Sequence, residues 1–253
     1  MADGAHPSSD TSRRVFTMLE NNPDVMNELA QRLGLSSDLA FHDVYSLDDP
    51  SLLAMIPRPV HALLVIIPMT DTWKRERDAE NEQTEWYGGA GPEEPVIWFR
   101  QTIIQGCGLI GFLHCALNGV PATKIIPDSP LAKLREEAIP LKLKERAELL
   151  SESDTIYEAS QAVAVKGDTA PLDQDAHEGL GQHFVAFVKG RDGNLWELEG
   201  SRKGPIRRGA LTEERDVLSE EALQLGLKRV IELQKAKDED LRFSCIALAP
   251  REG

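Results

Sequence analysis

The sequence has few cysteines and few aromatic residues. Only three of its 253 residues are cysteine, and aromatic residues make up 6%. Cys107 and Cys115 are too far apart in sequence for the short spacing of a zinc-binding pair. With Cys245 they make three cysteines, an odd number that forms no paired disulfide framework. This cysteine usage predicts no metal site and favours a reducing compartment, cytoplasmic or nuclear.

No uninterrupted apolar segment approaches the roughly 18 residues that a membrane-spanning helix needs. The most apolar run, from Val60 to Pro68, is much shorter and contains His61. The first ten residues are small and polar and lack the charged and then apolar layout of a secretory signal. We therefore expect neither membrane insertion nor secretion.

Positive charge is also scarce. Lys and Arg number 28 against 42 Asp and Glu, which gives a formal net charge of −14. Such a surface repels nucleic acids and anionic membranes, so we expect neither as a partner. It favours a basic partner, although acidity also simply keeps a protein soluble, and charge alone does not separate the two explanations.

Helix and strand signals are intermixed along the chain. Asn22 is placed to cap a helix that begins at Pro23 and ends at Gly34. The run from Val60 to Ile67 predicts a central strand that is buried on both faces. The other expected elements are short strands at 41–44 and 96–99, helices at 51–56, from 70, at 109–117, from 129 and at 219–237, a hairpin of 183–188 and 195–198, and a last strand at 242–249. The pattern predicts one α+β domain over residues 14–250, preceded by a disordered segment at 1–13.

Cys107 is the strongest candidate nucleophile. It lies between Gly106 and Gly108 at the start of an apolar helix, where backbone N–H groups and the helix dipole stabilise a thiolate. The flanking glycines allow backbone and substrate to approach closely. From position alone, an ordinary core cysteine remains an open alternative. Cys115 and Cys245 lack this setting and are expected to be structural.

His183 is the strongest candidate base, because a catalytic histidine lies far from its cysteine in sequence yet close to it in space. It begins a predicted strand directly after a long polar segment. His114 lies two helical turns beyond Cys107, or about 10 Å along the helix. That separation exceeds hydrogen-bond reach of the thiol, so we expect His114 to be structural.

Glu199 is the first candidate to orient this histidine. His183 and Glu199 are symmetric about Arg191, so a hairpin centred there places them opposite each other with Cβ atoms about 4.5–5.5 Å apart. A carboxylate in that place fixes the orientation of the imidazole and stabilises its charged form. A hairpin centred on Asp192 and the following glycine breaks this pairing. Glu197, on the same face by alternation, is the alternative, and either glutamate remains open as a solvated strand charge.

Two segments resemble the ubiquitin carboxyl-terminal hydrolases. One is residues 101–114, Gln-Thr-Ile-Ile-Gln-Gly-Cys-Gly-Leu-Ile-Gly-Phe-Leu-His, and the other is the hairpin from His183 to Gly200. The resemblance extends over about residues 15–249. It implies a papain-like α+β fold with a central, mostly antiparallel sheet between helices, a knotted backbone, and cleavage after the C-terminal glycine of ubiquitin. Residues from about 151 to 182 then correspond to the family's crossover loop, which limits the leaving group to small or unfolded pieces.

The resemblance also implies roles for single residues. Cys107 is the nucleophile, His183 is the general base and then the acid, and Gln101 donates to the oxyanion together with the backbone N–H of Cys107. Glu199 stands where the family usually has Asp and completes a Cys-His-Glu triad. Gln105 stands where the family usually has Asn.

These features predict a monomeric, cytoplasmic deubiquitinating thiol hydrolase that acts on small ubiquitin adducts and uses no cofactor or metal. The chain stops soon after its last predicted strand, which favours the short, single-domain type of the family. The departures at Glu199 and Gln105 leave two alternatives open. One is a ubiquitin-binding module with weak or no catalysis, and the other is a hydrolase for a ubiquitin-like modifier such as Nedd8.

Overall fold

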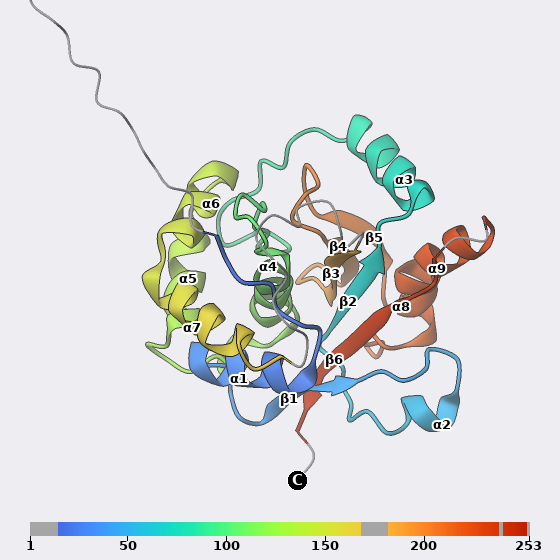
Figure 1. Cartoon of the computed structure of the whole chain (residues 1–253), viewed down its shortest axis with the longest axis horizontal. Coiled ribbons are helices and arrows are strands. Elements are labelled where there is room, and N and C mark those ends of the chain that lie inside the picture. Colours follow the sequence, from blue (N-terminus) through green and yellow to red (C-terminus); the bar gives the residue numbers. More distant parts are fainter. Residues whose placement is uncertain (1–14, 168–181, 238–239, 252–253) are drawn as a thin grey trace, which may run out of the picture.

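An antiparallel sheet lies between two groups of helices (Figure 1). The computed structural model describes residues 15–167, 182–237 and 240–251, so the segment expected to be disordered, 1–13, lies outside the described residues. Within those ranges, no helix is long and apolar enough to cross a membrane. The sheet that they form has six strands in the spatial order β1-β6-β2-β3-β4-β5. The strands are β1 (Leu39–Asp43), β2 (Ala62–Pro68), β3 (Gln182–Lys189), β4 (Asn194–Leu198), β5 (Ile206–Ala210) and β6 (Ser244–Pro250).

Several helices begin at the capping residues that the sequence predicts. Asn22 Oδ1 accepts a hydrogen bond from Asp24 N at 2.8 Å, and Gly34 ends the same helix with a φ of 94°. Ser129 Oγ caps α5 by accepting from Ala132 N at 3.2 Å. The helices are α1 (Pro23–Leu33), α2 (Pro50–Leu53), α3 (Asp71–Glu82), α4 (Cys107–His114), α5 (Pro130–Ala138), α6 (Leu143–Glu152), α7 (Asp154–Ala164), α8 (Glu220–Leu225) and α9 (Leu227–Lys235), with a π-helical turn at Cys115–Gly119 and a 3₁₀ turn at Ala122–Lys124.

The two faces of the sheet carry separate apolar cores. Helices α1, α4, α5, α6 and α7 cover one face, while α3, α8 and α9 cover the other (Figure 1). Strand β2 lies between β3 and β6 and contributes Leu64 to the first core and Leu63 and Val65 to the second. This confirms the predicted central strand and the α+β architecture.

The strand predicted at 96–99 is wrong, although these residues are buried. Side chains, not a neighbouring strand, form hydrogen bonds with the backbone N–H and C=O groups here. Asn118 Oδ1 accepts from Ile97 N at 2.6 Å, and its Nδ2 donates to Ile97 O at 2.9 Å. His114 Nε2 accepts from Phe99 N at 3.0 Å. A pattern of apolar residues reveals burial, but it does not reveal which groups satisfy the backbone.

The loop predicted from 151 to 182 is also wrong in its first part. Helix α6 continues through Glu152, and α7 follows at once, capped by Ser153. The buried face of α7 includes Ile156, Ser160 and Val163, a helical spacing that the polar composition of the segment hides. Residues 168–181 of this prediction lie outside the described residues.

The single helix predicted at 219–237 is divided in two. Gly226, with φ −108° and ψ −102°, interrupts it between α8 and α9. Strand β5 was not predicted, because Arg207, Arg208 and Gly209 at its centre remove the apolar alternation. Neither β5 nor the break between α8 and α9 changes the surroundings of Cys107, because its helix, α4, packs against β3.

Candidate active site

Cys107 is the first residue of a helix whose remaining residues are all buried. The helix is buried because α4 packs closely on the sheet, and this close packing depends on glycine at position 111. A Cβ atom at Gly111 would lie 2.7 Å from the side chain of Leu64 and 3.4 Å from that of Phe184. The absence of a side chain at 111 therefore lets α4 approach β2 and β3, which places Cys107 beside the start of β3.

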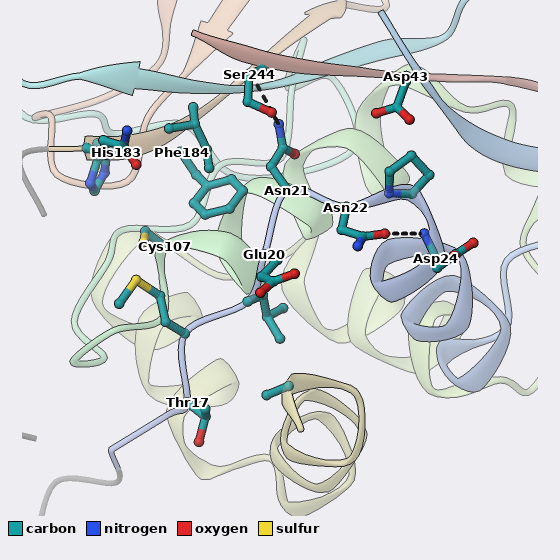
Figure 2. Close-up of a pocket in the computed structure, with 16 residues that line it drawn as sticks. Thr17, Glu20, Asn21, Asn22, Asp24, Asp43, Cys107, His183, Phe184 and Ser244 are labelled. Carbon is teal, nitrogen blue, oxygen red and sulfur yellow. Dashed lines mark hydrogen bonds between the residues drawn. The ribbon is translucent and has the colours of Figure 1, made fainter. Parts of the chain in front are cut away.

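Cys107 and His183 line one end of a cleft of about 710 Å³. Figure 2 shows them together on one side of the cleft, with Asp24 and Asp43 on the opposite side and Glu20 between. The lining comes from segments far apart in sequence, chiefly residues 17–24, the start of β3 and the start of β6. An acidic groove that ends at a cysteine and a histidine suits an extended, basic chain that reacts at its end.

His183 and Glu199 are in direct contact. His183 Nε2 lies 2.5 Å from Glu199 Oε1, and the two side chains are 12% and 0% exposed. The predicted register is nevertheless wrong, because Ala186 pairs with Leu198 and the hairpin is centred on Asp192. Contact is made because Glu199 follows the last residue of β4 and is not held opposite a ladder partner.

Ser201 fixes the carboxylate of Glu199. The backbone N–H of Ser201 donates to Oε1 at 2.7 Å, and its hydroxyl donates to Oε2 at 2.8 Å. Burial by itself raises the pKa of Glu199, but the charge of His183 and the hydrogen bonds from Ser201 hold that pKa below its ordinary value. Glu199 is therefore ionised beside the imidazole. Ser201 was not identified from the sequence, although a serine two residues after an acid often bonds to it locally.

Glu197 neither orients His183 nor points into solvent. It is 1% exposed, and its carboxylate lies 2.9 Å from Arg202 Nη2 and 2.7 Å from Arg208 Nε. Burial raises the pKa of Glu197, but Arg208 and Arg202 outweigh it and lower that pKa to about 2. Both predictions for Glu197, that it orients His183 or that it is a solvated charge on the strand, are therefore wrong. Glu197 is part of an ion network that includes Glu80 of α3.

Burial and backbone hydrogen bonds act in opposite directions on the pKa of the Cys107 thiol. Burial raises its pKa to about 11, and hydrogen bonds from the backbone N–H groups of Gly108 and Phe184 oppose that rise only in part. The backbone N–H groups at the start of α4 favour the thiolate, as expected, but burial of the sulfur outweighs them. A base must remove the proton. Because Nε2 of His183 faces Glu199, its Nδ1 is the nitrogen that remains for the thiol.

Gln101 is placed by its backbone beside the same residues. Its N–H donates to Gly200 O at 2.8 Å, directly after Glu199. Within the described ranges its side-chain amide has no hydrogen-bond partner, and Oε1 is buried. The amide can therefore turn its N–H groups toward a substrate oxygen. A Cβ at Gly200 would lie 2.9 Å from Gln101 Cβ, so glycine at 200 keeps room for this side chain.

His114 is structural, as expected. It is fully buried, and burial lowers its pKa to about 3, so the ring is neutral. Its Nε2 accepts from Phe99 N at 3.0 Å, which leaves the proton on Nδ1. This bond fixes the chain two residues before Gln101.

Comparisons with known proteins converge on one family. The family model described as ubiquitin carboxyl-terminal hydrolase, family 1, matches residues 16–232. Ubiquitin carboxyl-terminal hydrolase 3 of Arabidopsis thaliana is 33% identical over 248 residues, which cover 98% of this chain and 99% of the relative. Isozyme L1 of Sus scrofa is 30% identical over 230 residues, which cover 91% of this chain and 96% of the relative.

A solved structure has the same fold. The catalytic domain of Trichinella spiralis UCH37, crystallised with ubiquitin vinyl methyl ester, superposes with a TM-score of 0.69 at 18% identity. The superposition covers 94% of this chain and 97% of that domain. Similarity therefore extends over nearly the whole length in both sequence and fold.

Proposed function

Since the chain belongs to family 1 of the ubiquitin carboxyl-terminal hydrolases, and is thus a cysteine-type hydrolase, we propose that it releases small or unfolded adducts from the C-terminal glycine of ubiquitin. We assign the chemistry to Cys107, His183 and Glu199, with Gln101 as a donor to the oxyanion. The observation that carries this assignment is the 2.5 Å contact between His183 and a fully buried Glu199, at the end of the cleft that Cys107 lines.

In the first half-reaction, His183 Nδ1 takes the proton of the Cys107 thiol as sulfur attacks the carbonyl carbon of the ubiquitin glycine. The ionised Glu199 stabilises the resulting imidazolium. The backbone N–H of Cys107 and the amide of Gln101 donate to the tetrahedral oxyanion. His183 then gives its proton to the leaving amine, the C–N bond breaks, and a thioester remains on Cys107.

In the second half-reaction, water replaces the amine. His183 removes a proton from that water as its oxygen attacks the thioester carbonyl, and the imidazolium returns the proton to the departing sulfur. The products are free ubiquitin and the starting enzyme. The raised pKa of Cys107 makes the general base indispensable, because little thiolate exists before substrate binds.

The charge of the cleft supports ubiquitin as the substrate. Glu20, Asp24 and Asp43 line it, and the C-terminal tail of ubiquitin is basic. Opposite charges along a narrow groove guide the tail and set its direction, so that its last glycine reaches Cys107.

Hydrolysis of ubiquitin that carries a C-terminal coumarin amide tests the proposal. Wild-type protein should release the fluorophore, whereas Cys107→Ala should release none and keep its fold. Binding of ubiquitin without release would contradict catalysis and support the binding-module alternative. Faster release from the matching Nedd8 amide would instead identify a hydrolase for that modifier.

A further inference from the structure

An exposed pair of an aromatic ring and a cation precedes Gln101 in the chain. The guanidinium of Arg100 lies over the indole of Trp86, 4.4 Å from the ring centroid, and Trp86 is 50% exposed. Among the residues that the structure describes, Arg100 has no carboxylate partner, although the chain has an excess of acids. A cation over an aromatic ring is attracted to it, and no hydrogen bond joins the guanidinium N–H groups of Arg100 to a described residue. We call this pair the Trp86–Arg100 platform.

Backbone hydrogen bonds place the platform beside the catalytic residues. Tyr87 N donates to Lys203 O at 3.0 Å, and Lys203 Nζ donates to Thr84 O at 3.1 Å, so the Trp86 segment follows the chain just after Glu199. On the other side of the platform, Gln101 N donates to Gly200 O. Both residues of the pair are therefore held against the strand end that carries the histidine's carboxylate partner.

The platform lies away from the cleft for the ubiquitin tail. The cleft is lined by residues 17–24 and by the starts of β3 and β6, not by Trp86 or Arg100. Figure 1 shows the connection from α3 to α4, which carries the pair, on the opposite side of α4 from α1. Because this connection leads into Cys107, a leaving group that extends from the scissile bond away from the cleft would pass beside it.

We propose that the Trp86–Arg100 platform binds the leaving group and favours an acidic residue shortly after the scissile bond. This inference rests on the proposed function. Trp86 offers an apolar face to the leaving peptide, and Arg100 offers an unpaired charge. Lys203, whose Nζ donates to Thr84 O, adds a second positive charge beside the Trp86 segment. Glu85 is exposed next to Trp86, but no ion pair joins it to Arg100.

The test compares two ubiquitin fusions that differ in one residue. Each carries a short flexible peptide after the terminal glycine, with Glu in one and Lys in the other at the second position of that peptide. In wild type at low salt, kcat/KM for the Glu fusion should exceed that for the Lys fusion by about three- to tenfold, since a single exposed ion pair has a modest effect. The ratio should fall as salt is raised.

Variants identify the source of the ratio. Arg100→Glu should invert it, and Trp86→Ala should bring it closer to one by removing the support of Arg100. Each ratio is taken within one variant, so any general loss of activity cancels. Arg215→Glu is the matched control. Arg215 is exposed and lies near Lys189, at the opposite end of β3 from His183, so its reversal should leave the ratio unchanged.

Equal rates on the two fusions in wild type, or an unchanged ratio in Arg100→Glu, would overturn the inference. The ubiquitin coumarin amide, which carries no peptide, distinguishes this failure from a failure of the proposed function. Release of coumarin with equal rates on the two fusions would overturn the inference alone. Absence of any coumarin release would overturn both.

Discussion

His183 Nε2 lies 2.5 Å from Glu199 Oε1, while Glu197, two residues earlier and within β4, contacts Arg202 and Arg208. Both carboxylates are buried and ionised, yet they lie in different networks. Glu199 contacts the proposed catalytic base, and Glu197 ties β4 and β5 to α3. The two neighbouring acids therefore form a matched pair for separating effects on activity from effects on stability.

Glu199→Ala should lower kcat/KM on the order of 100-fold, because the imidazole loses the group that orients it and stabilises its charged form. Its free energy of unfolding should change less than that of Glu197→Ala. Rates on the ubiquitin coumarin amide and urea unfolding of each variant give both quantities.

Glu197→Ala should keep most of the activity of the folded protein but lower the free energy of unfolding by roughly 3 kcal/mol, because two buried guanidinium groups lose a partner. If Glu197→Ala lost more activity than Glu199→Ala, the assignment of Glu199 as the orienting residue would be wrong.

Ser201→Ala should lower kcat/KM about three- to tenfold, because Glu199 loses one of the donors that fix its carboxylate. That donor also lowers the pKa of Glu199, so its removal should move the acid limb of the pH–rate profile to higher pH. Ser201→Thr should restore both features. An unchanged acid limb in Ser201→Ala would show that the hydroxyl does not act on Glu199.

His114 should make the protein sensitive to acid. Burial lowers its pKa to about 3, so between about pH 6.5 and pH 3 the unfolded chain binds a proton that the folded protein does not. Stability from this group is therefore lost as pH falls below 6.5. At roughly 1.4 kcal/mol for each pH unit, wild type should lose about 3 kcal/mol more than His114→Gln between pH 6.5 and 4. Parallel stability curves for the two proteins would contradict this.

Gln105 has a φ of 59°, in the left-handed region that Asn adopts more readily than Gln. Gln105→Asn should raise the free energy of unfolding by about 0.5–1 kcal/mol, and the β-branched Gln105→Val should lower it. Asp128→Asn is the control. Asp128 has a φ of 60°, which Asp and Asn both tolerate, so this substitution should leave the free energy of unfolding nearly unchanged. Equal stability of the Asn and Val variants at 105 would exclude backbone strain there.

The sequence predicted those parts of the fold that local signals determine. Asn22, Pro23 and Gly34 mark both ends of α1, and the apolar run of β2 identifies the central strand. Cys107 and His183 were singled out by their surroundings, and the structure places both on one cleft. Their catalytic roles stay predictions until they are tested.

The remaining features depend on contacts between distant segments, which a single sequence does not reveal. The predicted contact between His183 and Glu199 is confirmed, but the premise behind it is wrong. The hairpin is centred on Asp192 and not on Arg191. Burial of Glu197 depends on Arg202 and Arg208 folding back over it. Burial of the Cys107 thiol, which outweighs the helix N-terminus, likewise follows only from packing.

Covalent capture tests most directly the claim that Cys107 is the nucleophile. Intact mass is measured after incubation with ubiquitin whose C-terminus carries a vinyl methyl ester, a group that adds to a nucleophilic thiol. Wild type should gain the mass of one ubiquitin, and Cys107→Ala, with Cys115 and Cys245 intact, should gain none. Capture by the Cys107→Ala protein, or attachment at Cys115 or Cys245 in wild type, would contradict the account.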